Sequence, residues 1–208
     1  MERLTSSIET LKHSEVKTLV DNRISEFMEF MNKSVEEIFK ELCFCIMTAN
    51  CSAEKCIEVH EKIENRFLSF TEDQLITKFK ELGYRFPNVR ANYIVQARNK
   101  MMELENALKS EENDVDLRDW IVRNIKGIGY KEASHFLRNI GFSNYAIIDF
   151  HIIDILAKHK LIDKPKYLTK TRYIEIESVL ERLGKKTNLT LAELDLYLWY
   201  METTKILK

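Results

Sequence analysis

The chain has 208 residues, of which 45% are hydrophobic and 31% charged, and its formal net charge is −1. This composition excludes a disordered chain and is typical of a globular protein with enough residues for a sizeable core. The net charge close to zero argues against long-range attraction of nucleic acids, although backbone amides and a few cations can still bind phosphates locally. No signal peptide or membrane span is indicated, so we expect a cytoplasmic protein without membrane contact.

Helix signals follow one another along most of the chain, and glycine and proline are scarce. Apolar periodicity and N-capping residues predict helices over about 15–31, 34–48, 52–67, 71–83, 89–108, 116–124, 131–140, 149–159, 172–183 and 190–200. Gly83, Gly141 and Gly184 are expected to end three of these helices. Residues 145–148 have extended character but form no persuasive strand. The predicted fold class is therefore all-α.

We expect the helices to form two lobes with an active-site cleft between them. Residues 1–30 together with about 160–208 are assigned to a terminal lobe, and about 31–159 to the second lobe. The acidic residues 111–114 are expected to form a hinge.

The four cysteines are Cys43, Cys45, Cys51 and Cys56. Their spacing, C-x-C-x5-C-x4-C, matches neither a zinc site nor the usual iron–sulfur patterns. We therefore expect reduced thiols buried on a core helix, with no side-chain metal site and no organic cofactor.

Two of the five glycines lie in the sequence Lys126-Gly127-Ile128-Gly129-Tyr130-Lys131, between two predicted helices. A Gly-x-Gly turn permits positive φ and leaves N–H groups open to an anion such as a DNA phosphate. The pattern predicts a helix–hairpin–helix, and the alternative is a plain tight connection between antiparallel helices. Asp149 follows Lys131 by eighteen residues and is placed to cap a later helix.

The hairpin sequence, with Ala133, Phe136 and Leu137 after it and Ile148-Asp149-Phe150-His151 further on, resembles the helix–hairpin–helix DNA glycosylase superfamily. The resemblance spans roughly residues 35–160 and departs at Lys126, where a leucine is usual. The chain has neither the four-cysteine motif nor the β-rich N-terminal domain of other branches. It is therefore similar to the archaeal second type of 8-oxoguanine DNA glycosylase/abasic-site lyase.

This resemblance implies excision of 8-oxoguanine from duplex DNA by Lys131 and Asp149, in a protein expected to act as a monomer. An unprotonated lysine amine attacks the anomeric carbon, and the resulting Schiff base permits strand cleavage by β-elimination. Burial and the positive end of a helix favour the neutral amine, while an ionised Asp149 stabilises the cationic sugar. The alternatives are a surface lysine at a helix start and an aspartate that only caps its helix.

The remaining candidate residues fall into two groups. The DNA-binding candidates lie in the hairpin, in the turn 47–50, in the loop after Gly83 and beside Asp149; they are Gly127, Gly129, Tyr130, Asn50, Tyr84, Arg85, Phe86 and His151. The base-pocket candidates are His135, Trp199 and Lys208. For Tyr84, Phe86, His135 and Trp199, ordinary core packing is the alternative. The resemblance also implies a monovalent cation held by hairpin carbonyls.

Three other functions stay open on the sequence. The first is a glycosylase that removes another base lesion with the same catalytic residues. The second is a non-catalytic module that uses the hairpin only to bind DNA. A helical scaffold with an accidental hairpin is the third alternative, and it predicts no affinity for DNA.

Overall fold

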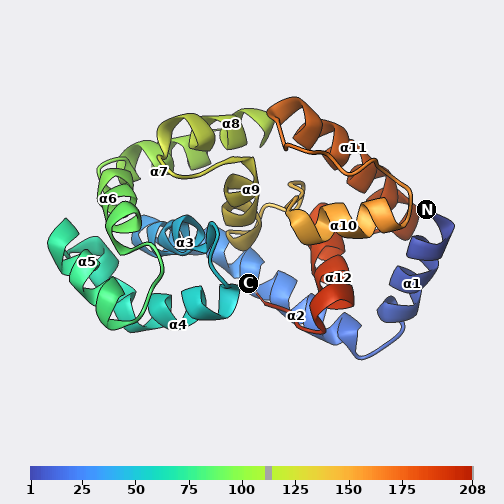
Figure 1. The fold of residues 1–208 in the computed structure, drawn as a ribbon, viewed down its shortest axis with the longest axis horizontal. Helices are drawn as coiled ribbons and strands as arrows, with labels where there is room; N and C mark the ends of the chain where they lie inside the picture. The colour runs from blue at the N-terminus through green and yellow to red at the C-terminus, as the bar shows by residue number, and fades with distance from the viewer. Residues whose placement is uncertain (111–113, 208) are drawn as a thin grey trace. The chain divides into compact units, whose positions relative to one another are not determined.

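The computed structural model describes residues 1–110 and 114–207 of the chain. Over these residues the protein consists of α-helices and two short 3-10 helices, with no β-strand (Figure 1). The predicted all-α fold is therefore confirmed. Lys208, expected in the base pocket, and residues 111–113, the centre of the expected hinge, lie outside the described residues.

The helices follow the chain in a simple order. Their bounds are α1 (Glu2–Lys12), α2 (Val16–Glu29), η1 (Phe30–Asn32), α3 (Val35–Thr48), α4 (Ala53–Ile63), η2 (Glu64–Leu68), α5 (Glu72–Glu81), α6 (Pro87–Arg98), α7 (Met101–Lys109), α8 (Asp114–Asn124), α9 (Tyr130–Asn139), α10 (Phe150–Lys158), α11 (Lys170–Thr187) and α12 (Leu191–Thr203). None of the helices in the described part of the chain is both long and apolar enough to cross a membrane.

The chain divides into two compact units. One consists of Met1–Met31 and Leu137–Lys208, here called the terminal unit, and the other of Asn32–Phe136, here called the central unit. The division falls inside α9. The sequence-based boundary between the two lobes near residue 160 stays a prediction.

Helix α3 forms the core of the central unit. Every residue from Phe39 to Thr48 is buried, and α3 packs against α4, α6, α7 and η2. A helix that is buried on all sides is expected to be apolar on all sides, which accounts for the cysteines on it. Cys43 and Cys45 are free and buried here, and Cys56 is free and buried on α4, as predicted. Cys51 is free and half-buried in the turn after α3.

Helix α12 forms the core of the terminal unit, where it packs against α1, α2, α10 and α11. Part of this core is a cluster of Val16, Val20, Phe27, Leu196 and Tyr197. Arg138 and Asp195 form a buried ion pair in the same unit, and the guanidinium of Arg138 lies 4.8 Å from the centre of the Phe27 ring. A buried ion pair is costly to break from one side, so it fixes the end of α9 to α12.

Several sequence-based helix predictions were wrong. The helix expected over 52–67 ends at Ile63 and is followed by the 3-10 helix η2, with Glu64 at φ 50°. Helix α1 was missed because only Leu4 and Ile8 of its residues are buried, too few to give a clear periodicity. The helix expected over 89–108 is broken after Arg98 into α6 and α7, although no glycine or proline marks the break. The guanidinium of Arg98 donates to the carbonyls of Phe67 and Phe70 and so anchors the end of α6 to the chain before α5.

Gly184 was also wrongly expected to end a helix. It lies inside α11, which continues to Thr187 and ends with Asn188 in the left-handed conformation. A Cβ at Gly184 would stand 2.8 Å from the carbonyl oxygen of Leu189. The glycine therefore permits a close approach of the chain after the helix. Gly83 and Gly141 do follow helix ends with positive φ, as predicted.

Candidate active site

The predicted helix–hairpin–helix is present in the central unit as α8, residues 125–129 and the first turns of α9. Gly127 has φ +85°, and a Cβ at this position would overlap the ring of Tyr93. The turn therefore requires glycine at 127 for two reasons. The predicted positive φ is thus present at Gly127, whereas Gly129 is not among the glycines with positive φ. Ile125 and Ile128 are buried and anchor the hairpin from inside.

Side chains from both helices hold the hairpin together. Arg118 of α8 is buried, donates to the hydroxyl of Ser134 at 3.2 Å and lies 5.3 Å from the centre of the Tyr130 ring. The hydroxyl of Tyr130 donates to the carboxylate of Asp119. Tyr130, a DNA-binding candidate, thus has its hydroxyl directed at α8 in the structure.

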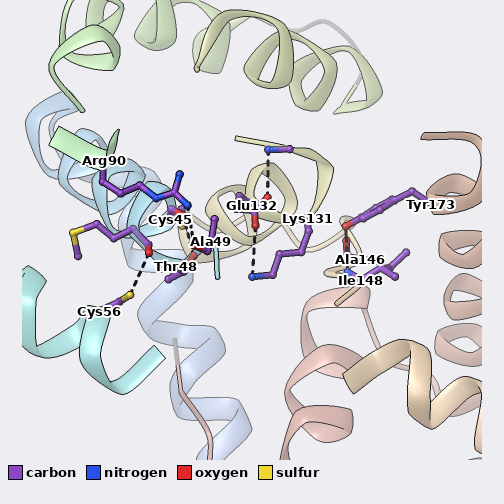
Figure 2. Close-up of polar contacts among 12 residues, drawn as sticks. Cys45, Thr48, Ala49, Cys56, Arg90, Lys131, Glu132, Ala146, Ile148 and Tyr173 are labelled. Atoms are coloured by element: carbon purple, nitrogen blue, oxygen red, sulfur yellow. Dashed lines mark hydrogen bonds and ion pairs between the residues drawn. The ribbon is translucent and has the colours of Figure 1, made fainter. Parts of the chain in front are cut away.

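One backbone amide of the hairpin is already occupied. The N–H of Gly129 donates to the carboxylate of Glu132 at 3.3 Å, so the expectation of a bare amide does not hold at this residue (Figure 2). This is the returning half of a capping box, in which the residue at the third helical position accepts from the amide before the helix. Sequence reasoning missed Glu132, although a glutamate three residues after Gly129 is the signal that finds it.

Lys131 is the second residue of α9 and its side chain is 27% exposed. Its Nζ lies 3.9 Å from the carboxylate of Glu132 (Figure 2). The thiol of Cys56 lies within range of the lysine charge: burial and Cys51 raise the pKa of Cys56, while Lys131 and Arg90 act to lower it. Lys131 therefore stands on a partly buried face of the central unit, near the start of α4.

The turn after α3 is held by side chains from other elements of the central unit. The carbonyl of Met47 accepts from the Tyr84 hydroxyl at 2.6 Å and from the Cys56 thiol at 3.4 Å. The carbonyl of Ala49 accepts from Arg90 at 2.8 Å (Figure 2). Asn50 follows with φ 60° and is exposed. The turn therefore presents an exposed asparagine on an anchored backbone.

The loop after Gly83 divides into a buried and an exposed part. Tyr84 is only 4% exposed, which supports the packing alternative for this residue. Arg85 is exposed, lies 4.9 Å from the centre of the Phe86 ring and donates to the Asn50 carbonyl at 3.4 Å. Asn50, Arg85 and half-buried Phe86 are thus brought together on one surface.

His135 is 8% exposed and its ring meets the Phe44 ring edge-on, with centroids 5.8 Å apart. This burial supports the packing alternative weighed for His135 from the sequence. Among the described residues no group of three or more His, Cys, Asp or Glu side chains is arranged to hold a metal ion. The absence of a cofactor and the monovalent cation at the hairpin stay predictions.

Asp149 lies in the terminal unit, where it is the N-cap of α10. Its Oδ1 accepts from the N–H of Ile152 at 3.0 Å, which confirms the predicted cap. Residues 145–149 form an irregular segment before this helix, and Asp149 itself has extended backbone dihedrals. Asp149 is half-buried, and one carboxylate oxygen fixes the start of the helix.

His151 and Trp199 are brought together in the terminal unit. Their ring centroids lie 5.0 Å apart in an edge-to-face arrangement, and Phe150, which is 66% exposed, lies against His151. The indole Nε1 of Trp199 is buried and has no hydrogen-bond acceptor among the described residues. His151, a candidate for DNA contact, and Trp199, a candidate for the base pocket, therefore lie side by side in the terminal unit.

A family model described as 8-oxoguanine DNA glycosylase matches residues 20–189. The chain belongs to this family. The 8-oxoguanine DNA glycosylase/AP lyase of Methanocaldococcus jannaschii is 51% identical over 206 residues, covering 99% of each chain. The Korarchaeum cryptofilum protein of the same name is 47% identical, covering 99% of this chain and 98% of the relative.

Solved structures of the family share the whole fold. The M. jannaschii 8-oxoguanine glycosylase/lyase in complex with a 15-mer DNA containing 8-oxoguanine matches with a TM-score of 0.96 at 49% identity, covering 99% of this chain and 100% of that one. The 8-oxoguanine DNA glycosylase of Thermotoga maritima matches with a TM-score of 0.93 at 38% identity, covering 100% and 99%. The resemblance of the hairpin sequence to the helix–hairpin–helix DNA glycosylase superfamily is thus confirmed.

The two hairpin glycines give a matched test of the turn. Gly127→Ala should lower the free energy of unfolding by about 2–4 kcal/mol, because it combines left-handed strain with overlap on the Tyr93 ring. Gly129→Ala should cost less than about 1 kcal/mol, the effect of a weaker helix start. Urea denaturation followed by circular dichroism measures both. Equal losses of unfolding free energy in the two variants would contradict the conclusion that the turn requires glycine at 127 but not at 129.

Proposed function

We propose that this chain excises 8-oxoguanine from duplex DNA and then cleaves the strand at the resulting abasic site, with Lys131 as the nucleophile. The observation that carries the proposal is the family membership, together with a lysine at the second position of the helix after the hairpin. A partly buried lysine at a helix start is an unusual position for a purely solvated cation, because the helix dipole disfavours positive charge there.

Lys131 acts in two successive steps. Its unprotonated Nζ attacks C1′ of the lesion nucleotide, and the base leaves with the electrons of the glycosidic bond and acquires a proton. The sugar ring then opens to a Schiff base on Nζ. Loss of a C2′ proton expels the 3′ phosphate, which breaks the strand, and water finally releases the lysine.

Asp149 assists the first step through its charge. The sugar develops positive charge as the glycosidic bond breaks, and an ionised carboxylate stabilises that charge. The same carboxylate is suited to accept the proton that Lys131 must lose before it attacks. Its fixed position as the N-cap of α10 supports this assignment, because the hydrogen bond from the Ile152 N–H holds the carboxylate in place.

The remaining residues bind and distort the DNA. Removing a base from a duplex requires that it be flipped out, at a cost of a few kcal/mol, and the gap must be filled. Exposed Asn50 and Arg85 with Phe86 are the candidates for this contact, while the hairpin from Gly127 and His151 on the terminal unit are suited to phosphates. Trp199 offers a flat wall for the flipped base.

Substitution of Lys131 tests the nucleophile. Lys131→Gln should lower the single-turnover rate of 8-oxoguanine excision by about 10³-fold or more, because the attacking amine is lost. The affinity for the duplex should change by no more than about threefold, since one charge is removed. Lys126→Gln removes a neighbouring hairpin charge and is the matched control, with excision close to wild type.

The substrate panel for this experiment separates the alternatives. Duplexes carrying 8-oxoguanine, thymine glycol or uracil are compared, each opposite its usual partner. If the wild-type protein released thymine glycol or uracil faster than 8-oxoguanine, the preferred substrate would be that lesion instead of 8-oxoguanine. Full activity of Lys131→Gln would remove Lys131 from the mechanism, and binding of all duplexes without release of any base would identify a non-catalytic module.

Substitution of Asp149 separates its two roles. Asn is as good an N-cap as Asp, so Asp149→Asn should change the free energy of unfolding by less than about 0.5 kcal/mol. The excision rate should nevertheless fall about 10²-fold, because the charge is lost. Asp154→Asn, at an exposed aspartate of the same helix that pairs with Lys164, is the control and should retain the wild-type rate. An unchanged rate in Asp149→Asn would show that the residue only caps α10.

A further inference from the structure

The segment just before Asp149 is held by side chains instead of by a neighbouring strand. Tyr173 of α11 donates its hydroxyl hydrogen to the carbonyl of Ala146 at 2.6 Å, and its oxygen accepts from the N–H of Ile148 at 3.2 Å (Figure 2). The carboxylate of Glu177, also on α11, accepts from the N–H of Ala146 at 3.0 Å. Three backbone polar groups on this stretch, the N–H and carbonyl of Ala146 and the N–H of Ile148, are therefore satisfied by two side chains.

The geometry of an extended chain explains this arrangement. In an extended segment the N–H and C=O of residue i and the N–H of residue i+2 point to the same edge, where a strand partner would normally pair with them. Residues 173 and 177 are four apart on α11, so their side chains lie on one face of the helix. That face takes the place of the strand partner for Ala146 and Ile148.

These hydrogen bonds are made where water cannot replace them. Ala146, Ile148, Tyr173 and Glu177 are all buried in the terminal unit. A buried backbone group that loses its partner costs about 1–3 kcal/mol and tends to move toward another partner. Loss of the Tyr173 hydroxyl leaves one carbonyl and one N–H unsatisfied, so the extended segment is free to shift.

We propose that Tyr173 and Glu177 are positioning residues for the Asp149 carboxylate. Asp149 directly follows Ile148, so a shift of the segment moves its Cα and its side chain. The cap bond to Ile152 fixes the carboxylate from the helix side only. The bonds from α11 supply the second anchor, on the side of the preceding chain. This inference rests on the proposed function, in which the ionised Asp149 assists excision.

A double-mutant cycle with Asp149 tests the positioning role. Tyr173→Phe should lower the single-turnover excision rate at saturating protein at least tenfold, with the affinity for the duplex unchanged within about twofold. In an Asp149→Asn background, the same Tyr173→Phe change should lower the rate by less than about twofold, because the carboxylate that it positions is already absent. A merely structural defect would lower the rate equally in both backgrounds.

Two further comparisons keep this test decisive. Tyr197→Phe removes the hydroxyl of another buried tyrosine of the terminal unit and should leave excision unchanged. If Tyr173→Phe does not fold, the pair Glu177→Gln and Glu177→Met replaces it. Glutamine keeps an acceptor for the Ala146 N–H, whereas methionine of similar length does not. The methionine variant should therefore show the slower excision, and only when Asp149 is intact.

The outcomes separate this inference from the function on which it rests. Wild-type rates for Tyr173→Phe, or equal losses in both backgrounds, would overturn the positioning role while the enzyme itself stays active. No excision by the wild-type protein, or no effect of Asp149→Asn alone, would instead overturn the proposed function or the role of Asp149 in it.

Discussion

Each of the two residues proposed to carry the chemistry lies at the start of a helix. Lys131 is the second residue of α9, and Asp149 is the N-cap of α10. Unpaired N–H groups make the first turn of a helix positive, which favours an anion and disfavours a cation. Both residues therefore lie where the helix backbone presents N–H groups to their side chains. Glu132, 3.9 Å from Lys131, partly offsets the effect and is itself held by the Gly129 N–H.

In both units a candidate functional residue follows a stretch of backbone that is held by side chains from other elements. In the central unit, Tyr84, Cys56 and Arg90 hold the carbonyls before Asn50. In the terminal unit, Tyr173 and Glu177 hold the chain before Asp149. Irregular backbone becomes precise only when its polar groups have partners, because otherwise it exchanges them with water. The supporting side chains are therefore as much a part of the site as the residues that face the substrate.

The sequence predicts the features of this site that depend on neighbouring residues, but few of those that depend on residues far apart in the chain. Helix caps, the Gly127 turn and the Asp149 cap depend on a few neighbouring residues, so spacing alone predicted them. Burial of Tyr84 and the role of Tyr173 depend on contacts between segments 37 and 27 residues apart, which leave no local pattern. Gly184 looked like a helix end because the carbonyl of Leu189 that requires a glycine there is visible only in the folded chain.

The most direct measurement is to locate the covalent bond to DNA. The wild-type protein is incubated with a duplex containing 8-oxoguanine opposite cytosine in the presence of borohydride, which reduces a Schiff base to a stable amine. Proteolysis and mass spectrometry of the isolated adduct then identify the modified residue. The account predicts a sugar remnant on Lys131. An adduct on another amine, such as Lys126 or the N-terminus, or base release without any adduct, would contradict it.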